Sequence, residues 1–414
     1  MIEGKILKYY REKKGYTQEQ LSKGICSVSH LSKIERGITE YSGEITTFLS
    51  KQLKINIQDE VRNYKGFEET LEEWKQAIVM LDTENMKVKK AALDANQLKD
   101  VPDFQVHYSL LLARHYLVTY EMEKCHKLME KIKKLDINLS PYENNLYKHV
   151  QGIYYFSIGS YKDSIEVLKK IDSSYKSQEY YYHLAISYHA VHDNTLAYHY
   201  AQKALHYFQE TLNFTRILDT ETLIILQLNA QSQFSLNETR DYYYKLVQSA
   251  KKIQSADRLM KLYYNFGEEL FRRKHFEEAK EYLEEGLALM KEEDFLFLTL
   301  LDLYINICYK GNLKSKESLL SDAKKGQHLS KKRKDQRYLY FNLHLLLLNG
   351  KEDSYYDYVE KKVLPYLIQC GNKVLIQHYE VKLFRYYMES GQIEKAWALS
   401  KKIMLAEKSC YELD

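Results

Sequence analysis

The amino-acid sequence predicts an all-α protein, and three observations lead to that prediction. Only 3 of the 414 residues are proline and 15 are glycine, fewer than strands joined by tight turns usually need. Two short segments near the N-terminus carry helix-capping residues. Small and large apolar residues then recur at fixed offsets through the rest of the chain. We therefore expect an N-terminal helix-turn-helix domain followed by a right-handed superhelix of about nine helix pairs.

The first three helices are expected from their caps. Gly15 ends the first helix. Thr17 and Gln20 have the spacing of a capping box and begin a second helix, which runs to about residue 24. Ser27 caps the third helix and Gly37 ends it. Further apolar residues predict a fourth helix and a fifth: Ile45, Phe48, Leu49 and Leu53, then 55–64.

The third helix has two unlike faces. At 100° per residue, Leu31 and Ile34 point to the domain core, while Ser29, Lys33 and Arg36 cluster on the opposite side. This arrangement is typical of a helix that reads the major groove of DNA. Lys33 can donate to guanine, and residues at helix ends can contact phosphates. The expected DNA-contacting residues are Gln18, Ser27, Val28, Ser29, His30, Ser32, Lys33 and Arg36.

The motifs Thr17-Gln18-x-x-Leu21 and Leu31-Ser32-x-Ile34-Glu35-x-Gly37 resemble those of the Xre and lambda-repressor-like helix-turn-helix family. The resemblance covers residues 2–64 and implies binding to double-stranded DNA, as a dimer, on a two-fold symmetric operator. The alternative is a plain solvated helix pair. Residues 1–64 hold 11 Lys and Arg against 8 Asp and Glu, a modest positive excess that suits dimeric binding. We expect a connector at 65–70 and a repeat domain at 71–414. The connector (61–70) can be a helix or a short hinge.

The repeat is clearest at Gly267, Phe276, Ala279 and Leu283. Small residues at these offsets let two helices cross closely, and the large residue fills the gap between them. The same offsets recur, in whole or in part, at Gly152, Tyr161, Ser164 and Leu168, at Ala185, Ala197 and Ala201, and at Phe384, Ile393, Ala396 and Ser400. The pattern resembles the tetratricopeptide repeat (TPR) family. The expected pairs are 68–98, 104–135, 143–171, 178–208, 217–252, 258–291, 296–330, 337–369 and 374–408.

Asparagine recurs on the first helix of four consecutive pairs, at Asn229, Asn265, Asn306 and Asn342. A carboxamide both donates and accepts, so such a series can hold the backbone of a peptide in the concave groove. Alternatively, some of them cap local carbonyls or bridge neighbouring repeats. Arg114 is a candidate for the peptide carboxylate, with exposure on the outer wall as the alternative, and Arg385 is a weaker candidate.

The combination of an Xre-type helix-turn-helix domain and these repeats resembles the Rap/Npr/Plc/Prg (RRNPP) quorum-sensing receptors, most of all their NprR and PlcR type. That resemblance implies a re-imported signalling peptide that changes homo-oligomerisation and DNA binding. The alternative is a protein that binds a response regulator of the sporulation phosphorelay and inhibits or dephosphorylates it; no residue independently supports that activity.

Enzyme, metal and membrane functions are not expected. The sequence has no Gly-rich phosphate loop, HExxH motif or nucleophile elbow. The histidines at 183, 189, 192 and 199 have neighbours that do not suit a metal site. The 5 cysteines are scattered without ligand spacing, which suits a reducing cytoplasm. There is no signal segment or long apolar stretch. We expect a cytoplasmic protein without cofactor, metal or membrane contact.

Overall fold

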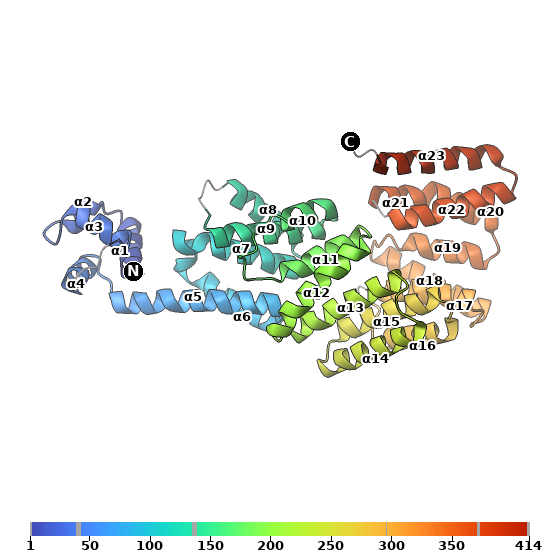
Figure 1. The fold of residues 1–414 in the computed structure, drawn as a ribbon, viewed down its shortest axis with the longest axis horizontal. Helices are drawn as coiled ribbons and strands as arrows, with labels where there is room; N and C mark the ends of the chain where they lie inside the picture. The colour runs from blue at the N-terminus through green and yellow to red at the C-terminus, as the bar shows by residue number, and fades with distance from the viewer. Residues whose placement is uncertain (1, 39–42, 135–138, 295, 371–372, 412–414) are drawn as a thin grey trace. The chain divides into compact units, whose positions relative to one another are not determined.

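The computed structural model describes residues 2–38, 43–134, 139–294, 296–370 and 373–411, and these residues form helices and loops without a β-strand (Figure 1). The side chains of residues 370, 373, 374 and 405–411, which include Cys370 and Cys410, lie outside this description. The all-α prediction is confirmed. The chain divides into two compact units, residues 1–233 and 234–414.

The first four helices of unit 1 form the predicted helix-turn-helix domain, here called the reader. They are α1 (Ile2–Lys13), α2 (Gln18–Ser22), α3 (Val28–Glu35) and α4 (Gly43–Gln52). Their common core consists of fully buried Leu7, Leu21, Leu31, Ile34, Leu49 and Leu53. Phe48 does not join this core: it is 55% exposed on α4. Where α1 crosses α3, a Cβ on Gly4 would lie 2.1 Å from the Ile34 carbonyl oxygen, so only glycine fits.

Helix α5 (Ile57–Met80) runs without interruption from the reader into the repeats. Of the two possibilities for the connector, a helix or a hinge, the structure has the helix, and the predicted end of a fifth helix near residue 64 is wrong. The reader also packs on the first repeats. Ile6 of α1 shares a buried apolar cluster with Tyr64, Phe67 and Phe104. Apolar burial of this kind favours a fixed position of the reader on α5.

The remaining helices follow the predicted pairs closely. Unit 1 continues with α6 (Thr83–Ala95), η1 (Gln97–Asp100), α7 (Pro102–Val118), α8 (Met122–Lys134), α9 (Pro141–Ser157), α10 (Tyr161–Leu168), α11 (Tyr180–Ala190), α12 (Asn194–Glu210) and α13 (Phe214–Ala230). Unit 2 holds α14 (Leu236–Lys252), α15 (Ala256–Arg272), α16 (Phe276–Ala288), α17 (Phe297–Lys310), α18 (Lys316–Lys332), α19 (Tyr338–Leu348), α20 (Glu352–Tyr358), η2 (Val359–Val363), α21 (Leu364–Cys370), α22 (Lys373–Glu389) and α23 (Ile393–Tyr411).

Close helix crossings occur where the repeat pattern places small residues. A Cβ on Gly152 would lie 2.4 Å from Leu168 Cγ, and one on Gly267 would lie 2.9 Å from Leu283 Cδ2. Ser164 is fully buried, and its hydroxyl donates to the Gly152 carbonyl at 2.8 Å. In these two pairs the leucine fills the space that a side chain on the glycine would need, as predicted.

Within unit 1, a hydrogen bond joins the start of α13 to the end of α5, far apart in the sequence. Asn213, at the start of α13, is 1% exposed, and its Nδ2 donates to the Val79 carbonyl oxygen at the end of α5 over 3.1 Å. Its Oδ1 accepts from the Arg216 amide at 3.1 Å and caps α13. One side chain thus joins two helix ends 134 residues apart.

No helix among the described residues is long and apolar enough to cross a membrane.

Candidate functional site

The turn between α2 and α3 is fixed by side-chain caps. The Gln20 amide donates to Thr17 Oγ1 at 3.1 Å, and the Thr17 amide donates to Gln20 Oε1 at 2.8 Å, which completes the predicted capping box. The His30 amide donates to Ser27 Oγ at 3.2 Å and so begins α3. Gly37, with φ of +69°, ends it. These caps hold α3 at a defined angle to α2.

Helix α3 exposes a polar face and buries an apolar face. Leu31 and Ile34 are fully buried, as expected of the core side. Most of the predicted DNA-contacting residues lie on the accessible side: Ser27, Val28, Ser29, Lys33 and Arg36 are exposed, whereas Gln18, His30 and Ser32 are half-buried. A helix with short polar and cationic side chains on its accessible face fits the major groove.

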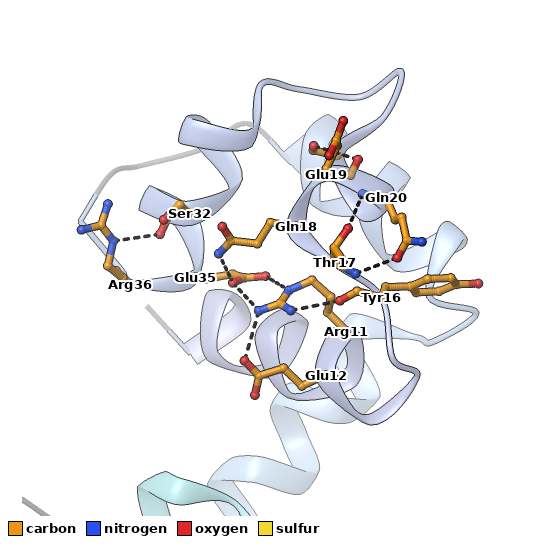
Figure 2. A network of polar contacts seen from close by, with 11 residues as sticks. Arg11, Glu12, Tyr16, Thr17, Gln18, Glu19, Gln20, Ser32, Glu35 and Arg36 are labelled. Atoms are coloured by element: carbon orange, nitrogen blue, oxygen red, sulfur yellow. Dashed lines mark hydrogen bonds and ion pairs between the residues drawn. The ribbon is translucent and has the colours of Figure 1, made fainter.

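A buried ion pair braces α3 from behind, and sequence reasoning gave it no role (Figure 2). Glu35 accepts from Arg11 Nε at 2.6 Å and from Arg11 Nη2 at 2.9 Å. Arg11 also donates to the Tyr16 carbonyl at 3.0 Å and to Glu12 at 3.1 Å. The hydrogen bond to Glu35 raises the pKa of Arg11. This network ties α1 to α3 and to the turn before α2.

Two of the predicted DNA contacts have other surroundings than expected. The Gln18 side-chain nitrogen donates to Glu35 Oε2 at 2.8 Å and so supports the ion pair. His30 Nε2 is shielded from solvent and has no hydrogen-bond partner among the described residues. Arg36 keeps an exposed guanidinium, with its Nε donating to the Ser32 carbonyl at 3.2 Å. Arg36 is thus exposed, whereas Gln18 and His30 are half-buried.

The four asparagines differ in their surroundings. Asn229 is only 2% exposed. Asn306 Nδ2 donates to the Asp302 carbonyl of its own helix at 3.2 Å. Asn342 Nδ2 donates to the Tyr358 hydroxyl at 2.7 Å, and its oxygen accepts from Gln327. Asn265 is half-buried, and no described hydrogen bond engages its carboxamide. The alternative of local and bridging bonds thus describes Asn306 and Asn342. Of the three half-buried asparagines, Asn265 is the one without a described hydrogen bond.

The asparagines also occupy unequal positions on their helices. A residue with positive φ follows each first helix: Ser232, Lys274, Asn312 and Gly350. Counted back from these residues, the asparagines lie three, nine, six and eight positions earlier, in chain order. Offsets three, six and nine differ by one or two turns, so Asn229, Asn306 and Asn265 lie at different heights on their helices, whereas the offset of Asn342 turns its side chain to another side. The four do not form a ladder of equivalent positions.

Arg114 matches neither of its two predicted settings. It is 3% exposed, and its Nη2 donates to Glu179 Oε2 at 2.6 Å. Arg216 contacts the other oxygen of Glu179 at 3.3 Å. Burial alone would raise the pKa of Glu179, but Arg114, with His183 and Arg216, lowers it to about 2. The Arg114 charge is therefore paired inside unit 1, and it is neither exposed nor directed at a ligand.

Known proteins resemble both the N-terminal domain and the repeats of this chain. Residues 7–59 match the helix-turn-helix family HTH_3. The apo form of the quorum sensor NprR from B. thuringiensis is 21% identical, with 84% of this chain and 99% of that chain covered and a TM-score of 0.66. NprR in complex with its cognate peptide NprX is also 21% identical, with 82% and 99% covered and a TM-score of 0.62.

A Rap protein in complex with competence and sporulation factor is 16% identical, with 83% of this chain and 98% of that chain covered and a TM-score of 0.66. No protein with a curated description matches the chain significantly. The chain therefore joins a helix-turn-helix domain to the helical-repeat fold of NprR and Rap proteins, and the predicted resemblance is confirmed at the level of the fold.

Proposed function

We propose that this chain is a cytoplasmic transcription regulator that binds double-stranded DNA through α3 and a short signalling peptide through its repeats. The observation that carries the proposal is the exposed face of α3, with Lys33 and Arg36 accessible and Glu35 fixed behind them. The likeness in fold to NprR in its complex with a peptide supports a peptide as the second ligand.

Peptide binding regulates DNA binding only if the peptide binds one arrangement of the protein better than another. A tenfold change in operator affinity requires about 1.4 kcal/mol of such preference. In the proposal the peptide supplies this energy by changing how two protomers pair, and therefore how two readers meet a two-fold symmetric operator.

Selection of duplexes from a random DNA pool by the full chain tests the DNA-binding part. We expect a two-fold symmetric site, and we expect Lys33→Ala to weaken binding to it by about 1–3 kcal/mol because a base contact is lost. Lys65→Ala is the matched control, since Lys65 is an exposed lysine on α5 away from α3. Equal affinity of Lys33→Ala and the wild type, or a pool that yields no common sequence, would contradict the proposal.

The competing function is binding of a response regulator, and the same proteins distinguish it. Aspartyl phosphate phosphatase F from Bacillus subtilis has the same type of fold, with 19% identity and a TM-score of 0.53. If the chain bound a receiver domain and no DNA, Lys33→Ala would leave that binding unchanged, and no duplex would be enriched. Measuring both ligands on one preparation separates the two functions.

A further inference from the structure

In unit 2, the first helices of four helix pairs carry polar side chains at one equivalent position, and their character changes from acidic to basic along the series. The residues that follow α15, α17, α19 and α22 with positive φ are Lys274, Asn312, Gly350 and Gly391. Six positions before each of them lie Glu268, Asn306, His344 and Arg385, here called the charge row. The row therefore reads, from α15 to α22, as carboxylate, carboxamide, imidazole and guanidinium.

Contacts between neighbouring helices show that the row lies along one face. His344 Nε2 and Asp302 Oδ1 are 2.6 Å apart and join α19 to α17. Asp302 lies one helical turn before Asn306, so both are on the same side of α17. Tyr264 of α15, one turn before Glu268, and Tyr379 of α22, one turn before Lys382, both lie near Asp302, because this carboxylate adds to burial in raising the pKa of each hydroxyl. The sides of α15, α17, α19 and α22 that carry the row thus face a common region around Asp302.

The charged groups at the two ends of the row form no ion pair among the described residues, and Lys382 Nζ lies 5.6 Å from the ring centroid of Tyr379 on its own helix. Glu268 has no ion pair among the described residues, and neither do Arg385 and Lys382 one turn before it. Burial raises the pKa of Glu268, and Glu269 adds to this effect. Burial lowers the pKa of Lys382, and Lys310 adds to this effect. The surroundings of each group thus disfavour its charged form, and a ligand that brings the opposite charge would stabilise that form.

A short linear peptide has this distribution of charge, with an ammonium at one end and a carboxylate at the other. Neighbouring packed helices lie about 8–10 Å apart, so three steps from α15 to α22 span roughly 24–30 Å. An extended chain advances about 3.3–3.6 Å per residue and covers that span with about seven to nine residues. Asn265 lies beside Glu268 on α15. In the middle of the row, Asn306 donates one N–H to the Asp302 carbonyl, and no described hydrogen bond engages its carboxamide oxygen. Their carboxamides can bond to a peptide backbone of any sequence.

We propose that the charge row binds a peptide of about seven to nine residues in a single direction. The N-terminal ammonium, or a basic first residue, lies at Glu268. The C-terminal carboxylate, or an acidic last residue, lies at Arg385 and Lys382. This inference rests on the proposed peptide-sensing function and adds to it the direction and charge pattern of the ligand.

Two randomised heptapeptide pools test the direction. One pool has Lys first and Glu last, and the other has Glu first and Lys last, with the same random residues between. Each pool is mixed with the full chain, and the peptides that co-elute with the protein are counted by mass spectrometry. We expect about tenfold more of the Lys-first pool, equivalent to about 1.4 kcal/mol.

A charge exchange in the protein should invert this preference. Glu268→Arg with Arg385→Glu keeps the net charge and reverses the row, so the Glu-first pool should now be retained in excess. The matched control is Glu277→Lys with Lys331→Glu, which exchanges two exposed charges on the second helices α16 and α18. The control should keep the wild-type preference.

The outcomes separate this inference from the function on which it rests. Equal retention of both pools by the wild type, or an unchanged preference in the exchanged variant, overturns the proposed direction and leaves peptide binding in place. Retention of neither pool, with operator binding intact, overturns peptide sensing itself and the inference with it.

Discussion

Removing the carboxylate behind the recognition helix should loosen that helix without changing any residue of its exposed face. In Glu35→Ala the Arg11 guanidinium loses its two contacts of 2.6 and 2.9 Å, and Gln18 loses its acceptor at 2.8 Å. The side chains of Arg11 and Glu35 are 10% and 1% exposed, so this is a buried pair. Breaking such a pair costs about 3–5 kcal/mol.

The cost should lie at the lower end of that range, about 3 kcal/mol, because Arg11 keeps part of its environment. The Tyr16 carbonyl still accepts from it at 3.0 Å, and Glu12 remains 3.1 Å away to balance its charge. Replacing both partners, as Arg11→Met with Glu35→Leu, removes the orphaned charge and should restore much of the loss. The two single effects should therefore not add.

Amide hydrogen exchange on the full chain measures this effect locally. A loss of about 3 kcal/mol corresponds to roughly a hundredfold faster exchange of the α3 amides where exchange follows local opening. Helix α15 in unit 2 is the internal reference. Glu19→Ala is the matched control, because Glu19 is an exposed carboxylate on α2. Two results would refute the reasoning. One is unchanged exchange of the α3 amides in Glu35→Ala. The other is a double variant whose loss of local stability equals the sum of the losses in the two single variants.

Three further results are expected. Gly4→Ala should destabilise the reader by about 1–3 kcal/mol, measured by the same exchange, because its Cβ would overlap the α3 backbone. Unit 1 should lose stability as the pH falls from 6.5 towards 3 in circular dichroism melts. Burial lowers the pKa of His183 to about 3, and that of Glu179 is about 2, so both values lie below the ordinary 6.5 and 4.5. Groups with lowered pKa stabilise at high pH and lose that contribution on acidification. Asn265→Ala should weaken peptide binding by about 1–3 kcal/mol in a titration.

Each of these expectations has a variant that should behave differently. Gly43→Ala should be harmless, since a Cβ there meets no atom of the described residues within 4 Å. Arg114→Met should flatten the acid dependence, because Arg114 is the main group that lowers the pKa of Glu179. Asn342→Ala should reduce the stability of unit 2 more than peptide binding, since Asn342 is bonded internally to Tyr358. The first expectation would be contradicted if the reader is as stable in Gly4→Ala as in Gly43→Ala. The second would be contradicted if unit 1 loses no stability on acidification, and the third if Asn265→Ala binds the peptide as tightly as the wild type.

Features fixed by neighbouring residues were predictable from the sequence. The caps at Thr17 and Ser27 depend on residues three positions away, and the faces of α3 follow from its periodicity. The buried Glu35 had a signal that was not used: it lies four residues after Leu31, on the core side of α3. A carboxylate at such a position requires a buried partner, and Arg11 at the end of α1 was the nearby cation.

The arrangement of the repeats was harder to derive, because it depends on where each helix ends. Two residues with positive φ that follow first helices in unit 2, Lys274 and Asn312, are not glycines, so the sequence does not mark them. Without those ends the four asparagines look equivalent and the charge row is invisible. The burial of Arg114 was also hidden, because its partner Glu179 lies 65 residues away in the chain.

The unbroken helix α5 constrains how a peptide signal can act on the reader. Tyr64 of α5 donates to Asp103 at 3.0 Å, and Lys5 of α1 lies 3.4 Å from the same carboxylate. The Lys5 pair is partly exposed, so it contributes little, about 0–1 kcal/mol. The buried contact of Ile6 and the continuous helix hold the reader more strongly. A reader held in this way does not swing independently of the first repeats. In the proposed switch, therefore, the peptide changes the distance between two readers by changing how whole protomers pair, and that distance decides which half-site spacing the dimer fits.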